Sequence, residues 1–424
     1  MKYIMKYIYI LLMAIAFSYY VAGVQVAYWI RYVIAIIIFI MCLLPEILKK
    51  RKIDGVNFFC LKNYIMPIIF IALWSMVIWI VNKPAGFTTS NFTRMLSGCL
   101  NLIFSITTAI AATKMFGKKA IKYSVIAIAL SIAYNMICCI RIYGINLFIQ
   151  YITQAIYSTD FPYGSQLYNL GVALEVQDAT LATGFYILYF LFFDNEDTKR
   201  TKIKYLILLL ICSYIGFKRT EFLSLLITSI AIIFMKKFNQ KNVIIIIGTI
   251  LGIACFGYVV SIKTGIFEQI VDYLGVNITG RTNIYKWLSE YFDLSILYLG
   301  KGFSFVDTTM YETTGFASHS VIVRMFAELG CIPFFIWLYW YLIKIPLNVL
   351  KKYNIFNKKA GIITFSCIIY LFLTYFIGNS INFFCIQFSF MIIQTSLMFP
   401  EEKKMDRNIG GKHENSYFIN AKSI

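Results

Sequence analysis

His319, Arg219 and Arg281 are the residues of this sequence whose chemistry best suits a phosphorylated substrate. The planar guanidinium of arginine holds phosphate oxygens in pairs, and a neutral imidazole accepts a proton near pH 7. His319 is one of only two histidines, and the other, His413, lies in a polar C-terminal segment. The three residues together suit a site that holds a polyprenyl-pyrophosphate donor and activates an acceptor hydroxyl.

Lys218 and Arg219 lie in a tight turn, residues 216–221, between two apolar runs. Almost no loop surrounds them, so we expect both cations at the outer surface of a membrane. Two interpretations stay open. The cations bind a substrate phosphate, or their long side chains reach the phosphates of the surrounding lipids.

The segment from 280 to 330 holds the other candidates, which are Arg281, Tyr285, Trp287, Lys301, Arg324 and Glu328. A short helix is predicted after Arg281, and the sequence Gly300-Lys301-Gly302 predicts a turn. Arg324 and Glu328 are four residues apart, so they can pair on one face of a helix, which favours a structural role for that pair.

The elements that position these residues are apolar helices. Hydrophobic residues make up 60% of the 424 residues and charged residues only 14%, whereas a soluble domain carries about 25% charged residues. Long apolar runs without period-2 alternation predict spanning helices rather than a barrel. We place spans near 5–23, 27–47, 63–82, 95–115, 122–142, 178–194, 203–217, 220–236, 242–262, 319–342, 360–378 and 380–399.

The charges predict how these spans are oriented. The net charge is +19, and Lys and Arg gather in every second connection, at 2–6, 49–52, 118–122, 199–204, 236–241, 344–359 and 403–404. The positive-inside rule therefore predicts an even number of spans with both termini in the cytoplasm. Nucleic-acid binding is not expected, because the basic residues are not interleaved with aromatic residues outside the apolar runs.

The remaining connections face the outside, and two are long, at about 143–177 and 263–318. Aromatic and apolar residues run through both, so we expect short helices at the membrane surface. We treat 1–400 as one transmembrane domain and expect a disordered cytoplasmic tail at 401–424. The ten cysteines contain no Cys-x-x-Cys pair, so they predict packing residues; we expect no metal site and no cofactor.

The candidate residues also resemble the motif of a known family. Gly280-Arg281, Trp287, Gly300-Lys301-Gly302, His319 and Glu328-Leu329-Gly330 follow the order found in the O-antigen polymerase/ligase superfamily, which includes the Wzy-type bacterial polysaccharide polymerases. That family also tends to carry an arginine at a tight outer hairpin, as at Arg219. The resemblance covers about 205–345, and it departs from the family at Ser320, where an asparagine is common.

The resemblance implies an all-α polytopic protein of the bacterial inner (plasma) membrane, with about 12 transmembrane helices and a membrane-embedded glycosyltransferase (GT-C-like) architecture. It implies a metal-independent inverting glycosyltransferase that joins undecaprenyl-pyrophosphate-linked repeat units into an O-antigen or capsule. Arg219 and Arg281 would bind the pyrophosphate, with Lys218, Tyr285 and Lys301 as lesser candidates. His319 would act as the base or position the acceptor.

The resemblance leaves other functions open. Trp287, Arg324 and Glu328 would support the site rather than touch the substrate. A flippase and a chain-length regulator are the protein partners that a polymerase of this kind implies. A ligase that transfers finished glycan to a lipid or protein shares the same motif. A flippase of lipid-linked glycans is a third candidate, although the predicted spans carry few charges at mid-depth, which favours chemistry at the outer surface.

Overall fold

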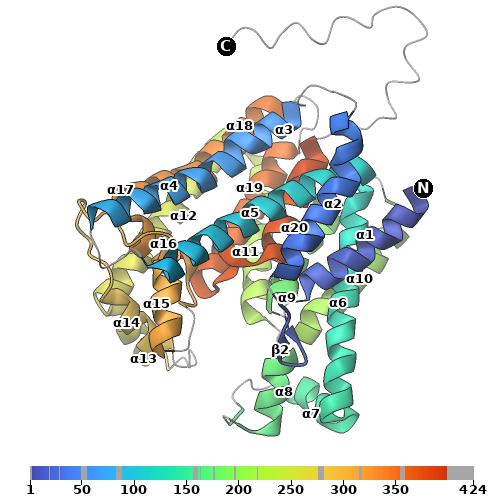
Figure 1. The fold of residues 1–424 in the computed structure, drawn as a ribbon, viewed down its shortest axis with the longest axis horizontal. Coiled ribbons are helices and arrows are strands. Elements are labelled where there is room, and N and C mark those ends of the chain that lie inside the picture. Colours follow the sequence, from blue (N-terminus) through green and yellow to red (C-terminus); the bar gives the residue numbers. More distant parts are fainter. Residues whose placement is uncertain are drawn as a thin grey trace, which may run out of the picture.

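The computed structural model describes residues 2–18, 20–27, 29–48, 55–82, 88–155, 161–162, 164–174, 177–194, 197–216, 218–275, 281–314, 318–353 and 359–398. Within these ranges the chain is almost entirely helical (Figure 1). The N-terminal elements are α1 (Lys2–Phe17), β1 (Tyr20–Val21), β2 (Val24–Gln25), α2 (Trp29–Leu48), α3 (Gly55–Cys60), the π-helix η1 (Leu61–Ile65), α4 (Met66–Val81), α5 (Thr89–Phe116) and α6 (Lys119–Tyr143).

The middle of the chain adds α7 (Ile145–Ala155), α8 (Gln166–Leu174), α9 (Gln177–Phe192), α10 (Lys199–Gly216), α11 (Arg219–Lys237) and α12 (Gln240–Lys263). The C-terminal elements are α13 (Ile266–Tyr273), α14 (Arg281–Ser289), α15 (Phe305–Thr314), α16 (Val321–Leu329), α17 (Cys331–Tyr339), the π-helix η2 (Trp340–Lys344), α18 (Ile345–Tyr353), α19 (Ala360–Ile377), the 3-10 helix η3 (Ser380–Asn382) and α20 (Phe384–Met398).

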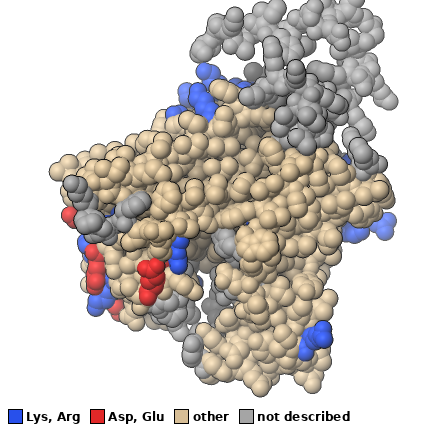
Figure 2. All heavy atoms as spheres, in the orientation of Figure 1, with Lys and Arg blue, Asp and Glu red and all other residues tan. Residues whose placement is uncertain are grey.

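Five helical stretches are long and apolar enough to cross a membrane by length and composition: Gly55–Val81, Thr89–Phe116, Lys119–Tyr143, Gln240–Lys263 and Cys331–Tyr353. Shorter apolar helices lie beside them, among them Ala360–Phe376 and Phe384–Met398. In Figure 2 uncharged side chains cover nearly all of the visible face. A water-excluded environment explains this pattern, because large apolar side chains such as Ile80 and Leu226 stay exposed on the helices.

The two C-terminal helices form the centre of the bundle. Both α19 and α20 are buried along nearly their whole described length. α20 packs against α5 and α9, and α19 packs against α11. Residues 378–383 join the end of α19 to the start of α20 and include the polar residues Asn379, Ser380 and Asn382.

The basic connections meet at one end of the bundle. Lys122 forms an ion pair with Asp197, the Lys6 ammonium lies 5.1 Å from the centre of the Tyr123 ring, and Lys352 donates to the Gly55 carbonyl at 3.1 Å. Burial lowers the pKa of Lys359, and the nearby charges of Lys236 and Lys202 lower it further. Four sets of contacts thus join connections that the sequence assigns to the same side.

Three predicted spans differ from the observed helices: one ends earlier, one is divided into two helices, and one begins later. The span predicted at 5–23 is wrong at its end, because α1 stops at Phe17 and Ala22-Gly23 turns the chain into the β1–β2 hairpin with positive φ at both residues. The buried Arg31 fixes this end of α1 by donating to the Ala16 carbonyl at 3.2 Å and the Ser18 carbonyl at 3.3 Å.

The span predicted at 319–342 is not one helix but two. Gly330, with φ +83°, separates α16 from α17, and a Cβ atom there would lie 2.3 Å from the Leu299 carbonyl carbon. The span predicted at 380–399 begins as the short η3 before α20 starts at Phe384. The long connections contain helices, α7 and α8 in the first and α13, α14 and α15 in the second. The predicted tail at 401–424 lies outside the described residues.

Candidate functional site

His319 lies in the short connection 318–320 that enters α16, and its backbone is in the left-handed region with φ +50°. Only a few per cent of non-glycine residues adopt this conformation, and histidine is one of the types that do so more often. The Tyr285 hydroxyl donates to the His319 carbonyl at 3.5 Å, which links the connection to α14. The structure therefore holds the backbone of His319 from a second element.

Hydrogen bonds also fix the residues on either side of His319. The Ser318 hydroxyl donates to Asp307 Oδ1 at 3.1 Å. Ser320 forms the N-cap of α16, because its hydroxyl accepts from the Val323 amide at 3.4 Å. Ser320 thus has a structural use as the residue that caps α16.

A buried ionic cluster lies behind this connection. Arg324 has no exposed surface and pairs with Asp307, and its Nε also donates to Glu328 Oε1 at 3.1 Å. Its Nη1 donates to Asn379 Oδ1 at 2.9 Å, and Asn379 Nδ2 donates to both Asp307 oxygens, at 3.2 and 3.1 Å. The cluster ties α15 and α16 to the break between α19 and α20, because a buried charge needs partners of this kind.

The two glycine motifs meet at the other end of α16. The Lys301 amide donates to the Ala327 carbonyl at 3.0 Å, and the Gly302 amide donates to the Glu328 carbonyl at 2.8 Å. These bonds satisfy carbonyls that the last turn of a helix leaves without an internal partner. A Cβ atom on Gly300 would lie 2.4 Å from the Glu328 carbonyl oxygen, so the close approach requires glycine.

Arg281 is the first residue of α14. It lies one turn before Tyr285, so the two side chains share a face of that helix. Burial raises the pKa of Tyr285, and a hydrogen bond with Tyr258 and the charge of Arg281 oppose that rise. Arg281 is half-buried. The structure therefore brings Arg281 and Tyr285 to the His319 connection. Residue Gly280 lies outside the described residues.

Lys218 and Arg219 begin α11, with Lys218 in extended conformation as its N-cap. α11 packs along α19, and the charge of Lys236 at its far end acts on Lys359 at the start of α19, so the two helices run antiparallel. The first turn of α11 therefore lies beside the C-terminal end of α19. That end is close to His319, because the Gly378 carbonyl accepts from the Val321 amide at 3.2 Å. The side chain of Arg219 lies outside the described residues.

Two predicted residues lie away from His319. Lys301 lies near Ala327, at the C-terminal end of α16, and the nine residues of that helix separate it from His319 by about 13 Å. Trp287 is half-buried and packs against Tyr291, with ring centres 4.2 Å apart. The structure places Trp287 as a packing residue of α14 and Lys301 at a separate position.

Sequence reasoning missed Asp307, Ser318, Asn379 and Asn382. Asp307 accepts from all three of the others and from Arg324, so it is the centre of the cluster. The signals available in the sequence were an acidic residue in an otherwise apolar connection and two polar residues, Asn379 and Asn382, between two apolar runs.

Among the described residues, no group of three or more His, Cys, Asp or Glu side chains is placed to hold a metal ion. Arg281 lies on the helix whose Tyr285 hydroxyl donates to the His319 carbonyl, so this helix brings a cation towards the connection. Such a site can stabilise developing negative charge by fixed donors.

Comparison with known proteins identifies no family for this chain. No protein-family model matches it, and no curated protein matches it.

Proposed function

We propose that this protein polymerises polyprenyl-pyrophosphate-linked oligosaccharides at the outer face of a bacterial plasma membrane. The observation that carries the proposal is the contact between its separated motifs. Gly300-Lys301-Gly302 docks on Glu328-Leu329-Gly330, and Tyr285, on the helix that Arg281 opens, holds the carbonyl of His319. Residues that resemble one family motif in sequence thus surround a single short helix, α16.

The proposed reaction is glycosyl transfer with inversion. The acceptor hydroxyl oxygen attacks the anomeric carbon of the donor sugar, and the bond from that carbon to the pyrophosphate oxygen breaks. His319 accepts the hydroxyl proton, or positions the hydroxyl, while the pyrophosphate leaves with the bonding electrons. Arg281 and Arg219 offset the negative charge that gathers on the leaving group.

The architecture that we propose follows from the same orientation. The basic connections that meet at one end lie in the cytoplasm together with both termini, and α13–α15 lie outside. About 12 helices then cross the membrane in a GT-C-like arrangement. In Figure 2 acidic and basic side chains both appear at the end that carries α13–α15.

The glycan ligase remains a second candidate because its motif is shared. A strain that lacks the gene separates the two functions. A polymerase deletion accumulates single lipid-linked repeat units, and a ligase deletion accumulates long lipid-linked polymer. A flippase deletion leaves single units at the cytoplasmic face, which a membrane-impermeant lectin does not reach in intact cells.

Complementation with Arg281→Lys tests the proposed role of the guanidinium fork. Lysine keeps the charge and loses the paired donors, so we expect at least about a tenfold fall in chain extension. Lys286→Arg, on the same helix and exposed, is the matched control and should complement fully. Normal polymer length with Arg281→Lys would remove Arg281 from the proposed site.

A further inference from the structure

A groove of about 320 Å³ lies between α4 and α17. This volume falls within the range of about 300–1,000 Å³ found for small-molecule sites. Its lining is apolar and rich in rings, and includes Met66, Phe70 and Trp74 from α4, and Pro333, Ile336 and Trp337 from α17. Neighbouring side chains on both helices, such as Leu73 and Ile332, are exposed, so the groove opens onto an apolar surface.

Two tryptophan hydrogen bonds hold the walls of the groove together at its two ends. Trp74 Nε1 donates to the Leu329 carbonyl at 2.9 Å, and Trp340 Nε1 donates to the Asn63 carbonyl at 3.0 Å. Asn348 supports the second bond by donating to Asn63 Oδ1 at 2.9 Å. The groove is therefore fixed at both ends and is not a chance gap between helices.

Both walls depart from regular α-helix next to the groove. The π-helix η1 precedes α4, and the π-helix η2 follows α17. Pro67 and Pro333, which lack an amide donor, lie in the lining itself. Single π-turns inside helices occur often at functional sites, and here one lies on each wall.

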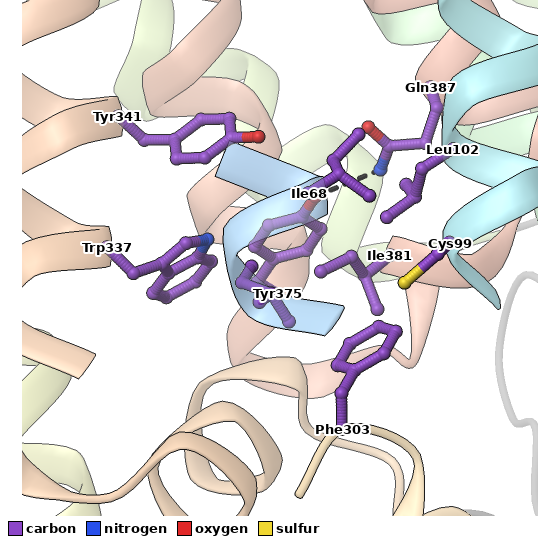
Figure 3. Close-up of a pocket in the computed structure, with 10 residues that line it drawn as sticks. Ile68, Cys99, Leu102, Phe303, Trp337, Tyr341, Tyr375, Ile381 and Gln387 are labelled. Atoms are coloured by element: carbon purple, nitrogen blue, oxygen red, sulfur yellow. Dashed lines mark hydrogen bonds between the residues drawn. The ribbon is translucent and has the colours of Figure 1, made fainter. Parts of the chain in front are cut away.

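The groove continues inward towards the ionic cluster. A smaller cavity of about 20 Å³ shares Ile71, Trp337 and Tyr341 with the groove and is bounded on its far side by Phe303 (Figure 3). The Phe303 ring centre lies 5.3 Å from the Arg324 guanidinium carbon. The smaller cavity thus lies close to the ionic cluster that positions the connection of His319.

A cation lies near each end of the groove: Lys301 at the Leu329 end, and Lys344, whose ammonium lies 3.5 Å from the centre of the Trp340 ring, at the other. The turn 300–302 lies over the Leu329 end, where Trp79 Nε1 donates to the Lys301 carbonyl at 2.8 Å and the Lys301 amide donates to Ala327. In the part of the chain that the structure describes, no carboxylate forms an ion pair with Lys301. An apolar groove with a cation at its rim suits a lipid phosphate whose hydrocarbon chain lies in the membrane.

We propose that this groove binds the polyprenyl chain of the lipid-linked acceptor, with Lys301 near its phosphate and about 13 Å from His319. The inference rests on the proposed function, which supplies a polyprenyl substrate. A polyprenyl chain has a methyl branch and a double bond in every unit, so it is wider and stiffer than a saturated acyl chain. The ring-lined walls at Phe70, Trp74 and Trp337 match that shape.

The test uses the full chain in nanodiscs of phosphatidylglycerol and phosphatidylethanolamine with a photoreactive polyprenyl phosphate. Cross-links should map to the lining residues of α4 and α17. Ile336→Trp fills the groove and should lower labelling at least about tenfold, equivalent to about 1.4 kcal/mol. Ile332→Trp, one turn away on the same helix and 56% exposed against 48% for Ile336, is the matched control and should stay within about twofold.

A second labelling experiment tests the role of Lys301 at the rim of the groove. Lys301→Gln should weaken labelling by polyprenyl phosphate and leave labelling by the uncharged polyprenol unchanged. Equal labelling of the Ile336→Trp variant and the native protein would overturn the proposal. Labelling of the groove by a photoreactive phospholipid that polyprenyl phosphate does not displace would also overturn it, in favour of an ordinary membrane lipid.

The probe carries no glycan, so its binding is independent of turnover. Groove labelling without any chain elongation would therefore overturn the proposed function and leave the lipid site standing. Chain elongation by the native protein with labelling outside the groove would overturn the lipid site alone.

Discussion

The Gly302 amide donates to the Glu328 carbonyl at 2.8 Å, which joins two glycine motifs that lie 26 residues apart in the chain. This bond fixes the end of α16, and the ionic cluster of Asp307, Arg324 and Glu328 fixes its body. His319 enters the same helix from a strained turn. The orientation of His319 therefore depends on how rigidly these contacts fix α16, whichever reaction the protein catalyses.

Gly300→Ala should disrupt this junction. Its φ is +94°, and the added Cβ would lie 2.4 Å from the Glu328 carbonyl oxygen, so we expect a loss of more than about 2 kcal/mol in folding free energy. Gly257→Ala is the control, because no atom lies within 4 Å of its Cβ position and alanine is the better helix former, by about 1 kcal/mol. Thermal unfolding in detergent compares the two, and equal midpoints would contradict the close packing.

Asp307→Asn should loosen the His319 connection. Removing one member of a buried ion pair costs about 3–5 kcal/mol, and Asp307 is 15% exposed, so we expect about 2–3 kcal/mol. Hydrogen exchange at 318–323 should rise. Glu312→Gln alters an exposed carboxylate that accepts from Ser90. It should change neither the folding free energy nor the hydrogen exchange at 318–323. Unchanged exchange in the Asp307 variant would show that the cluster does not position His319.

Tyr285→Phe removes the hydroxyl that donates to the His319 carbonyl. The bond is long at 3.5 Å, so we expect kcat to fall only about two- to fivefold with KM unchanged. Tyr273→Phe, at a residue that is 91% exposed, serves as the control. A rise in KM with an unchanged kcat would instead place Tyr285 in contact with the substrate.

The orientation of the bundle can be read from cysteine labelling. A membrane-impermeant maleimide should label Tyr273→Cys in intact cells and Lys237→Cys only after permeabilisation. Both positions are exposed, and α12 separates them, because Lys237 ends α11 just before α12 and Tyr273 ends α13 after it. The nine described native cysteines are buried or partly buried, which limits the background. The reverse pattern would invert the proposed sidedness.

Apolar runs predicted where most helices lie, because length and hydropathy alone require helical hydrogen bonding in a membrane. They did not predict the break at Gly330, since Cys331–Tyr339 continues the apolar run without interruption. That break depends on the turn at Gly300, which packs against it from 30 residues away. The end of α1 likewise depends on Arg31, a residue of the next helix.

The site could be predicted only in part for the same reason. Arg281, Tyr285 and His319 were predicted from residue type and spacing, and in the structure the Tyr285 hydroxyl, on the helix that begins at Arg281, donates to the His319 carbonyl. Asp307 and Asn379 are 72 residues apart and belong to no motif, so their pairing exists only in the folded chain. The groove between α4 and α17 lies beside two π-helices, η1 and η2, that no apolar pattern reveals.

Elongation of a synthetic polyprenyl-pyrophosphate-linked repeat unit by the purified protein is the most direct test of the proposed function. His319→Asn is the informative variant, because asparagine tolerates the left-handed backbone of His319 and keeps the connection folded. The account predicts long chains from the native protein and at least about a hundredfold slower extension by the variant. Absence of extension by the folded native protein, or equal extension by His319→Asn, would contradict it.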